Sequence, residues 1–559
     1  MKSKLFNSTI KKSIVTTVVC LVCFSQVLFA QNSKNAYSSV YHYEVSVGTR
    51  TAYLWIPPSC KYVRAVIFAA ENALERNWME SPIIRKAATE ENLAMIWLAD
   101  GKNSIINYEI KPEAALLLDT MFFDLAKISG YDELKFTPII FTGHSWNGRM
   151  AWNYPAQKSG RTLAAVAIRT YPMPDTLLFK NIPFLYIVGQ TTELPQYNDG
   201  RLSNRDFFWP VVQQTALALR AKDENNLIGV AVNPGGCHMD WTDEQSKLLA
   251  LFIHKACKYR LQNNYPANGK VILKKILPSS GYLTDAGLME ADKYPPASYH
   301  QYKGNTKKSF WFFDKELADA VIAFNGDRKI KQKQMPTFVQ DNDTLSVQKN
   351  GYVHLKWLPE KDGLSFKLHT TFLKKIPAGL IDSMNEINHA EQAIKLYHVM
   401  GPAVQINDTV FKLQFDRQKP RNIMIMADAA GNNIFRRAAQ PASLNIQAVL
   451  NEGAEQKIIF PSIKNQKAGI KYLQLQATSS SGLPVQYYIK SGPAVIDGDK
   501  IIFTPVPVKS KYPVKITVTV WQYGTVTEPK IKSAEPVTQS FYLIKEQAMK
   551  KNKKYDANN

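Results

Sequence analysis

The stretch Phe141-Thr142-Gly143-His144-Ser145-Trp146-Asn147-Gly148 decides how the first part of this chain folds. An apolar run, 138–141, precedes it, and a mixed run with helical character, 149–154, follows it. A buried strand, a Gly-x-Ser turn and a helix in this order predict a nucleophile elbow, in which a tight turn lifts a serine hydroxyl above the edge of a sheet. Ser145 is therefore a candidate nucleophile, and the amide of Trp146 is a candidate donor to an oxyanion.

One residue departs from the usual Gly-x-Ser-x-Gly pattern of such a turn. Asn147 stands where the last glycine is expected, and the glycine comes one step later, at Gly148. Because asparagine adopts left-handed backbone more readily than most residues, we expect the elbow to form, with less room around it. An ordinary Gly-Ser turn is the alternative, so the rest of the chain has to decide.

Apolar strands alternate with helical patterns on both sides of the elbow. Residues 43–56 alternate around Gly48 and predict a β-hairpin. Continuous apolar runs predict buried strands of a parallel sheet at 64–69, 93–98, 163–168, 183–188 and 227–232. Helices are predicted between them at 82–91, 112–129 and about 206–222, and a last helix begins with the capping box Thr242-Asp243-Glu244-Gln245. The pattern predicts an α/β fold, with a mostly parallel sheet between two layers of helices.

A serine nucleophile needs a base, and the base needs an acid that orients it. The loop Pro234-Gly235-Gly236-Cys237-His238-Met239-Asp240-Trp241 follows the last predicted strand, so it lies at the same carboxyl edge of the sheet as the elbow. His238 is therefore the predicted base, and we expect His144 to pack beneath the elbow. Asp240 stands too near His238 along the chain to orient it, and we expect it to bind the loop.

The acid is expected after the strand 183–188. Glu193 is the first choice there, and Asp199 and Asp206 in the same loop are the alternatives. A further donor to the oxyanion is predicted in the loop after the strand 64–69, at the backbone amide of Ala70 or Glu71.

These motifs carry a resemblance to a known family. From about Tyr43 to Leu261 the chain resembles an α/β-hydrolase, and more narrowly the secreted carbohydrate esterases of Bacteroidetes. The resemblance implies ester hydrolysis through an acyl-enzyme, with no metal and no cofactor. The short gap between the predicted strands 163–168 and 183–188 leaves no space for an inserted cap, so we expect an open pocket that admits a polymer. Trp146, Trp209 and Trp241 are candidates for stacking on sugar rings, with core packing as the alternative.

The N-terminus has the three parts of a secretory signal. Lysines come first, then the apolar run 14–24, then Leu28-Phe29-Ala30. No later apolar segment is long enough to span a membrane. We expect an exported protein, periplasmic or secreted, that is cleaved near Ala30. Three cysteines remain after cleavage (Cys60, Cys237 and Cys257), so at most one intramolecular disulfide can form.

The chain has 559 residues and a formal charge of +22, part of which lies in the signal and in the tail. Nucleic acid is not an expected partner of an exported protein. We expect the excess of basic residues to be spread over the solvated surface, and binding of an anionic polysaccharide or a bacterial surface is the alternative.

The length implies several domains. We expect a signal peptide at 1–30, the hydrolase domain at 36–262, a β-rich domain, a sandwich, at 270–450, an immunoglobulin-like sandwich at 456–545 and a basic tail at 546–559.

The sequence thus predicts a secreted serine esterase that hydrolyses acyl or methyl esters on a plant or algal polysaccharide or oligosaccharide. A serine peptidase of the same fold is one alternative. A glycan-binding protein with an inactive hydrolase domain is the other.

Overall fold

The computed structural model describes residues 39–99, 112–174, 181–190, 208–262, 271–285, 294–326, 331–348, 350–378, 385–417 and 422–545. The predicted signal peptide, the basic tail and the loop that holds Glu193, Asp199 and Asp206 lie outside these ranges. Within them, no helix is both long and apolar enough to cross a membrane. Cys60, Cys237 and Cys257 are buried and free.

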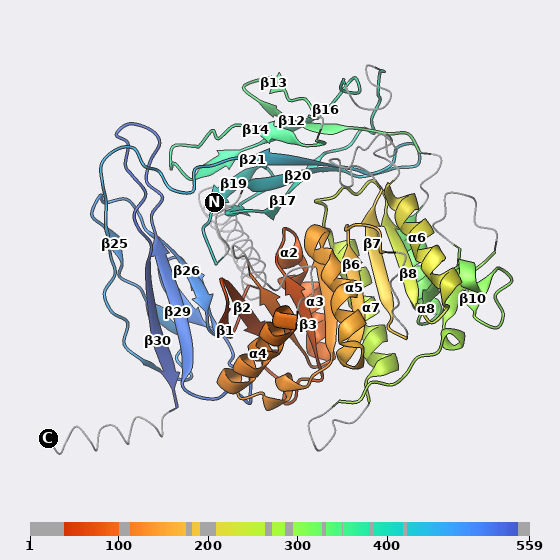
Figure 1. The fold of residues 1–559 in the computed structure, drawn as a ribbon. Helices are drawn as coiled ribbons and strands as arrows, with labels where there is room; N and C mark the ends of the chain where they lie inside the picture. The colour runs from red at the N-terminus through yellow and green to blue at the C-terminus, as the bar shows by residue number, and fades with distance from the viewer. Residues whose placement is uncertain are drawn as a thin grey trace, which may run out of the picture.

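An eight-stranded sheet forms the centre of the first half of the chain, in the order β1-β2-β4-β3-β5-β6-β7-β8 (Figure 1). Its strands are β1 Tyr43–Val47, β2 Arg50–Trp55, β3 Ala65–Ala70, β4 Leu93–Leu98, β5 Ile139–His144, β6 Thr162–Ile168, β7 Phe184–Gly189 and β8 Ile228–Asn233. The hairpin β1–β2 is antiparallel and joins β4 antiparallel, and the pairs from β4 to β8 are all parallel. This is the strand order of the α/β-hydrolase fold. Strands β3 to β8 are buried along their whole length, as their continuous apolar runs predict.

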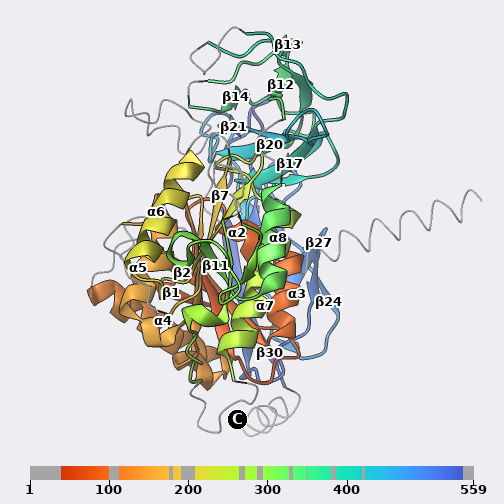
Figure 2. The same ribbon diagram turned by 90° about the vertical axis from the view of Figure 1, so that its right-hand side faces the viewer.

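Helices cover both faces of this sheet (Figure 2), with α4, α5 and α6 on one face and α3 and α7 on the other. The first part of the chain, up to residue 262, is the predicted hydrolase domain, and we call it the hydrolase part. Its helices are α2 Glu75–Met79, α3 Pro82–Glu90, α4 Pro112–Ser129, α5 Met150–Gln157, α6 Phe208–Lys222 and α7 Asp243–Arg260, with 3-10 turns η1 Asp132–Lys135, η2 Ser145–Arg149 and η3 Ser159–Arg161. Thr242 caps α7 in the predicted capping box with Gln245. The α/β prediction is therefore confirmed.

The segment after the predicted linker packs on the hydrolase part, although we expected it in the β-rich domain. It contains η5 Pro278–Ser280, β9 Tyr282–Thr284, β10 Ala297–Ser298, η6 Thr306–Lys308, β11 Phe310–Phe312 and α8 Lys315–Asn325. The ring of Phe312 lies so close to Gly229 of β8 that a Cβ there would meet it at 2.5 Å. The side chain of Asn325 accepts a hydrogen bond of 2.7 Å from the amide of Val232. A boundary near 262 therefore does not separate two independent cores.

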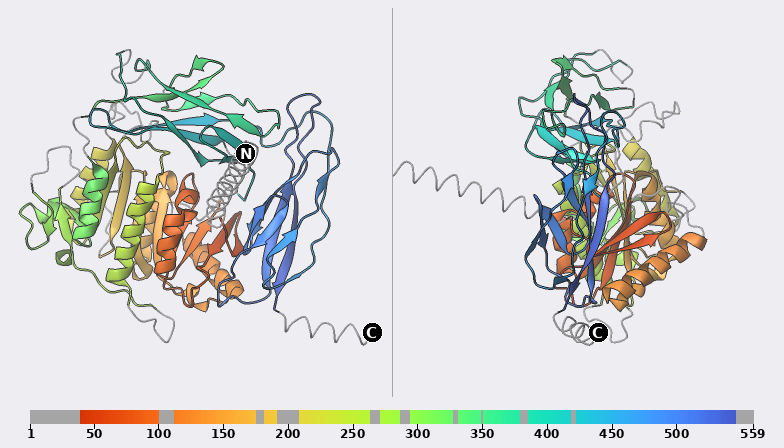
Figure 3. Two further views of the ribbon diagram at one scale, coloured as in Figure 1. Left: turned by 180° about the vertical axis from the view of Figure 1, so that it is seen from behind. Right: turned by 90° about the vertical axis from the view of Figure 1, so that its left-hand side faces the viewer.

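The next part of the chain, which we call the middle module, is built of small sheets (Figure 3). One sheet has the order β14-β21-β20-β17, and two three-stranded sheets, β13-β12-β16 and β15-β19-β18, complete the module. The strands are β12 Pro336–Gln340, β13 Asp343–Thr344, β14 Val353–Leu355, β15 Ser365–Lys367, β16 His369–Phe372, β17 Lys395–Met400, β18 Ala403–Gln405, β19 Val410–Leu413, β20 Ile423–Ala429 and β21 Ala438–Leu444.

The last module consists mainly of two sheets, β23-β30-β29-β26 and β24-β28-β27, with the short pair β22-β25. Its strands are β22 Ile458–Ile459, β23 Gln466–Lys467, β24 Tyr472–Gln474, β25 Thr478–Ser479, β26 Gln486–Ser491, β27 Ala494–Asp497, β28 Lys500–Phe503, β29 Val514–Trp521 and β30 Val537–Ile544. It lies beside the β1 edge of the large sheet (Figure 1), where Tyr43 donates a hydrogen bond of 2.5 Å to Ser510. Both modules are β-rich, as the sequence predicts.

Candidate active site

Strand β5 ends in the predicted elbow, and its backbone is strained at the serine. Ser145 has φ 52°, in the left-handed region, and it is the first residue of the turn η2, which helix α5 follows directly. Two glycines make the close packing possible. A Cβ on Gly143 would lie 2.4 Å from the carbonyl oxygen of Asn147, and a Cβ on Gly148 would lie 2.5 Å from the side chain of Thr170. The sharp turn therefore depends on both glycines.

Asn147 has a role that its place in the motif did not suggest. We expected it to tolerate left-handed backbone, but that conformation falls on Ser145 instead. The Asn147 side chain is buried and donates hydrogen bonds of 3.1 and 3.0 Å to the carbonyl oxygens of Ala70 and Glu71. The amide thus ties the elbow to the end of β3, which a glycine at this position could not do.

The loop after β8 brings His238 to the serine. Its Nε2 lies 2.9 Å from the Oγ of Ser145, and the imidazole is only 8% exposed. In the neutral tautomer with the proton on Nδ1, Nε2 accepts the hydrogen bond and the serine hydroxyl donates it. The two residues are 93 positions apart in the chain, and the sheet places them at one edge. This geometry permits His238 to take the serine proton.

His144 lies beneath this pair, as we expected. It is fully buried, and its Nε2 is 3.0 Å from the carbonyl oxygen of His238. A carbonyl only accepts hydrogen bonds, so Nε2 of His144 carries the proton. Burial, and then the neighbouring charge of His238, hold the pKa of His144 well below its usual range. His144 is therefore a neutral donor that supports the backbone of the base.

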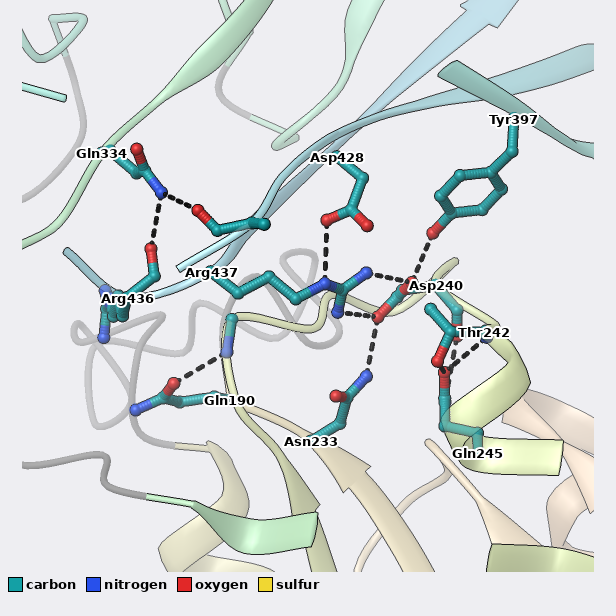
Figure 4. Close-up of polar contacts among 12 residues, drawn as sticks. Gln190, Asn233, Asp240, Thr242, Gln245, Gln334, Tyr397, Asp428, Arg436 and Arg437 are labelled. Atoms are coloured by element: carbon teal, nitrogen blue, oxygen red, sulfur yellow. Dashed lines mark hydrogen bonds and ion pairs between the residues drawn. The ribbon is translucent and has the colours of Figure 1, made fainter. Parts of the chain in front are cut away.

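Asp240 binds far more than its own loop (Figure 4). Its carboxylate is fully buried, and the amide of Asn233 donates to it over 2.7 Å, as the expected loop contact. Arg437 of the middle module adds two hydrogen bonds, of 2.7 and 2.9 Å, one to each oxygen. The hydroxyl of Tyr397 also donates to it, and Arg169 lies 3.5 Å away.

Opposing effects act on the pKa of the Asp240 carboxyl. Burial alone would raise it, but the charge and hydrogen bonds of Arg437, and after them the charge of Arg169, outweigh burial and hold the pKa well below its usual range. Asp240 is therefore a buried anion. Sequence patterns gave no sign of its partners, because Arg437 stands 197 positions away.

The hydrogen bonds of the loop after β3 exclude one of the predicted oxyanion donors, the amide of Glu71. The amide of Glu71 donates to the carbonyl oxygen of Leu98 over 2.8 Å, so it is already used in the sheet. The amides of Asn72 and Ala73 donate to the carboxylate of Glu75, over 2.7 and 2.9 Å. Ala70 is the last residue of β3, and the register Ala69↔Thr142 turns its amide toward the carbonyl oxygen of Thr142 in β5, so the Ala70 amide is also used in the sheet. Of the predicted donors, the amide of Trp146 therefore remains.

Glu75 also contacts the elbow itself, since it accepts a hydrogen bond of 2.8 Å from the amide of His144. The side chain is completely buried in the first turn of α2. Burial raises the pKa of Glu75 to about 6, against the lowering effect of these backbone hydrogen bonds. A single carboxylate thus joins the loop after β3 to the end of β5.

The three tryptophans proposed for sugar stacking differ in exposure. Trp209 and Trp241 are 6% and 8% exposed, and Trp241 packs on Trp78 with ring centroids 5.1 Å apart. Both side chains are therefore core residues, and the alternative interpretation holds for them. Trp146, next to the candidate nucleophile, is 42% exposed, and the guanidinium of Arg149 lies 3.9 Å from the centre of its ring.

Among the residues that the structure describes, no group of three His, Cys, Asp or Glu side chains is placed to hold a metal ion. The predicted acids Glu193, Asp199 and Asp206 lie outside the described residues.

Comparisons with known proteins found similarity only among solved structures, since no family model and no curated protein matches the chain. The poly(3-hydroxybutyrate) depolymerase LpqC from Bordetella parapertussis is 11% identical, over 39% of this chain and 92% of that one, with a TM-score of 0.29. An S-formylglutathione hydrolase from Agrobacterium tumefaciens is 13% identical, over 39% and 93%, with a TM-score of 0.27. Est1E from Butyrivibrio proteoclasticus is 13% identical, over 39% and 100%, with a TM-score of 0.26.

Proposed function

We propose that this protein is a serine hydrolase of carboxylic esters, with Ser145 as nucleophile and His238 as base. The observation that carries the proposal is the distance of 2.9 Å between His238 Nε2 and Ser145 Oγ, at a serine held in strained backbone at the end of β5. Strain of this kind costs free energy and persists where the surrounding structure enforces it. Nucleophilic catalysis requires a serine whose hydroxyl is hydrogen-bonded to a base, and here the base is a buried imidazole and the serine stands in strained backbone.

In the proposed reaction the Ser145 oxygen attacks the carbonyl carbon of the ester while His238 takes the hydroxyl proton. The negative charge that develops on the carbonyl oxygen is stabilised by the amide of Trp146. His238 then gives the proton to the departing alcohol, which leaves an acyl group on Ser145. Water, deprotonated by His238, releases the acid and restores the serine.

The acid that orients His238 is proposed in the loop between β7 and α6. Glu193 is the first choice, with Asp199 and Asp206 as alternatives. Asp240 is not proposed for this role because its two oxygens are bound by Arg437, Tyr397 and Asn233.

For the substrate we propose an acyl or methyl ester on a plant or algal polysaccharide, acted on after export and cleavage of the signal near Ala30. Two features support this choice. The N-terminus has the pattern of a secretory signal, and Trp146 beside the nucleophile is 42% exposed, so its side chain is available for contact with a sugar ring.

The decisive experiment is labelling with a fluorophosphonate probe, followed by assays on acetylated and methylated polysaccharides. We expect the wild-type protein to be labelled at Ser145, and the Ser145→Ala variant to remain unlabelled, with turnover reduced about a million-fold. An unlabelled wild-type protein that still binds glycan would identify an inactive binding protein instead. Labelling together with cleavage of peptides and not of esters would identify a peptidase.

A further inference from the structure

One face of the middle module is built into the hydrolase part. Along β20, alternate residues point to opposite sides, as in any strand. Ile423, Ile425 and Ala427 belong to the core of the module. Met424 and Met426 belong to the same core cluster as the helices α3 and α7 of the hydrolase. The sheet of the module is therefore buried on both faces, and its outer face is part of the hydrolase core.

The polar residues of this outer face meet the loop that carries His238. Tyr397 comes from β17, Asp428 from β20, and Arg437 directly precedes β21. Arg437 donates to both oxygens of Asp240, and its Nε donates to Asp428 over 2.8 Å (Figure 4). Two carboxylates thus fix the orientation of one guanidinium, whose fork matches the carboxylate of Asp240.

The backbone of the module also touches this loop. Gly235 has φ 64°, and a Cβ added there would lie 1.7 Å from the carbonyl oxygen of Arg437. The carbonyl oxygen of Gly235 accepts a hydrogen bond of 3.2 Å from the amide of Ala439. The module therefore holds the loop at Gly235 and again at Asp240, and His238 lies between these two points.

We propose that Arg437 and Tyr397 are positioning residues for His238, so that the middle module completes the catalytic centre. This inference rests on the proposed function of His238. The two side chains act through Asp240 and do not touch the reacting atoms. If the contact is lost, the loop is held by the hydrolase part alone, and Nε2 of His238 is no longer kept at hydrogen-bond distance from Ser145. A displacement of about 1 Å at a reacting group can cost roughly 100-fold in rate.

The test uses the full chain and the variants Arg437→Met, Arg437→Lys and Tyr397→Phe. The matched control is Asp416→Asn, which removes another interface ion pair, with Arg76 of α2, and leaves the contacts of Asp240 intact. The measurements are kcat and KM for a small aryl ester, and hydrogen exchange of the amides in residues 234–241. Exchange reports on the loop whether or not the protein hydrolyses esters.

We expect Arg437→Met to lower kcat by about 100-fold with little change in KM, and to speed exchange at 234–241. Arg437→Lys keeps the charge but not the forked guanidinium, so its kcat should lie between those of the wild type and of Arg437→Met. Asp416→Asn should leave kcat and the exchange of this loop as in the wild type. If Arg437→Met does not fold, Tyr397→Phe tests the inference instead, because it removes a single hydroxyl. It should also lower kcat and speed hydrogen exchange at 234–241.

Wild-type kcat and wild-type exchange in a folded Arg437→Met protein would overturn the inference. Equal effects of Asp416→Asn on kcat and exchange would also overturn it, because docking in general would then explain them. If the wild-type protein itself neither hydrolyses esters nor reacts with the probe, the proposed function fails, and exchange at 234–241 alone shows whether Arg437 holds the loop.

Discussion

The imidazole of His144 lies directly beneath that of His238, with ring centroids 4.7 Å apart and with Nε2 3.0 Å from the carbonyl oxygen of His238. Two histidines thus occupy one site, and only one of them reaches the serine. The buried ring of His144 donates a hydrogen bond to the backbone of His238, and the ring of His238 is hydrogen-bonded to Ser145. Their different surroundings predict different effects of substitution.

His238→Ala should lower turnover by about a million-fold, as loss of the serine does, because members of one catalytic unit fail together. His144→Gln keeps a donor for the His238 carbonyl and should retain much more activity than His144→Ala. Steady-state kinetics on a small aryl ester, with circular dichroism to check folding, measure these effects. Full activity in His238→Ala, with none in a folded His144→Ala, would show that the base is His144.

A comparison of the variants Glu193→Gln, Asp199→Asn and Asp206→Asn tests which residue is the orienting acid. Each variant keeps the size of the side chain and removes its charge. We expect only Glu193→Gln to lower the turnover number, by about four orders of magnitude with little change in KM, because the acid stabilises the imidazolium and fixes its tautomer. A collapse in one of the aspartate variants would assign the acid to that residue. No collapse in any of them would direct attention to another carboxylate.

Gly235→Ala should be much more damaging than Gly48→Ala. Both glycines have left-handed backbone, with φ 64° and 59°, so the two substitutions share a similar conformational cost, about 1 kcal/mol. The new methyl group meets nothing within 4 Å at Gly48, but it would meet the carbonyl oxygen of Arg437 at Gly235. Urea unfolding and ester turnover measure the difference. Equal losses of stability in the two variants would show that the module can move away from the loop without cost.

Glu75 should make stability depend on pH in an unusual direction for a carboxylate. Its folded pKa is raised to about 6 from an ordinary value of 4.5, so the folded state binds this proton more tightly than the unfolded state. The contribution of Glu75 is fully present below about pH 4.5 and is lost as the pH rises through about 6, a change of about 2 kcal/mol. Urea unfolding of the wild type and Glu75→Gln from pH 4.5 to 7 should show this difference. Parallel curves for the two proteins would contradict it.

Truncation after Leu261 should give an insoluble or inactive fragment. All the candidate catalytic residues precede this point, which by itself favours an active fragment. The cut, however, removes Phe312, which packs on Gly229 of β8, and Arg437, which binds Asp240. Expression of the fragment beside the full chain, with probe labelling of both, tests this. A soluble fragment that is labelled at the full rate would show that the catalytic part folds and works alone.

The sequence by itself determined the large sheet and the place of the elbow in it. Strands such as β5 and β8 have continuous apolar runs, and the signals that mark their ends lie within a few residues of them. The same local signals predicted His238 on a glycine-rich loop after the last strand. Such patterns can be read because a strand, a turn and a helix start depend on neighbouring residues.

Only the tertiary structure decided which surfaces meet. Arg437 and Tyr397 carry no local mark of their contact with Asp240, because a salt bridge between distant segments leaves no periodic pattern in either. The burial of Trp241 was equally open, since an aromatic residue in a loop suits a binding surface and a core alike. Local periodicity specifies the elements, whereas the packing of β modules against the base loop depends on the shape and charge of complete faces, which exist only after the chain has folded.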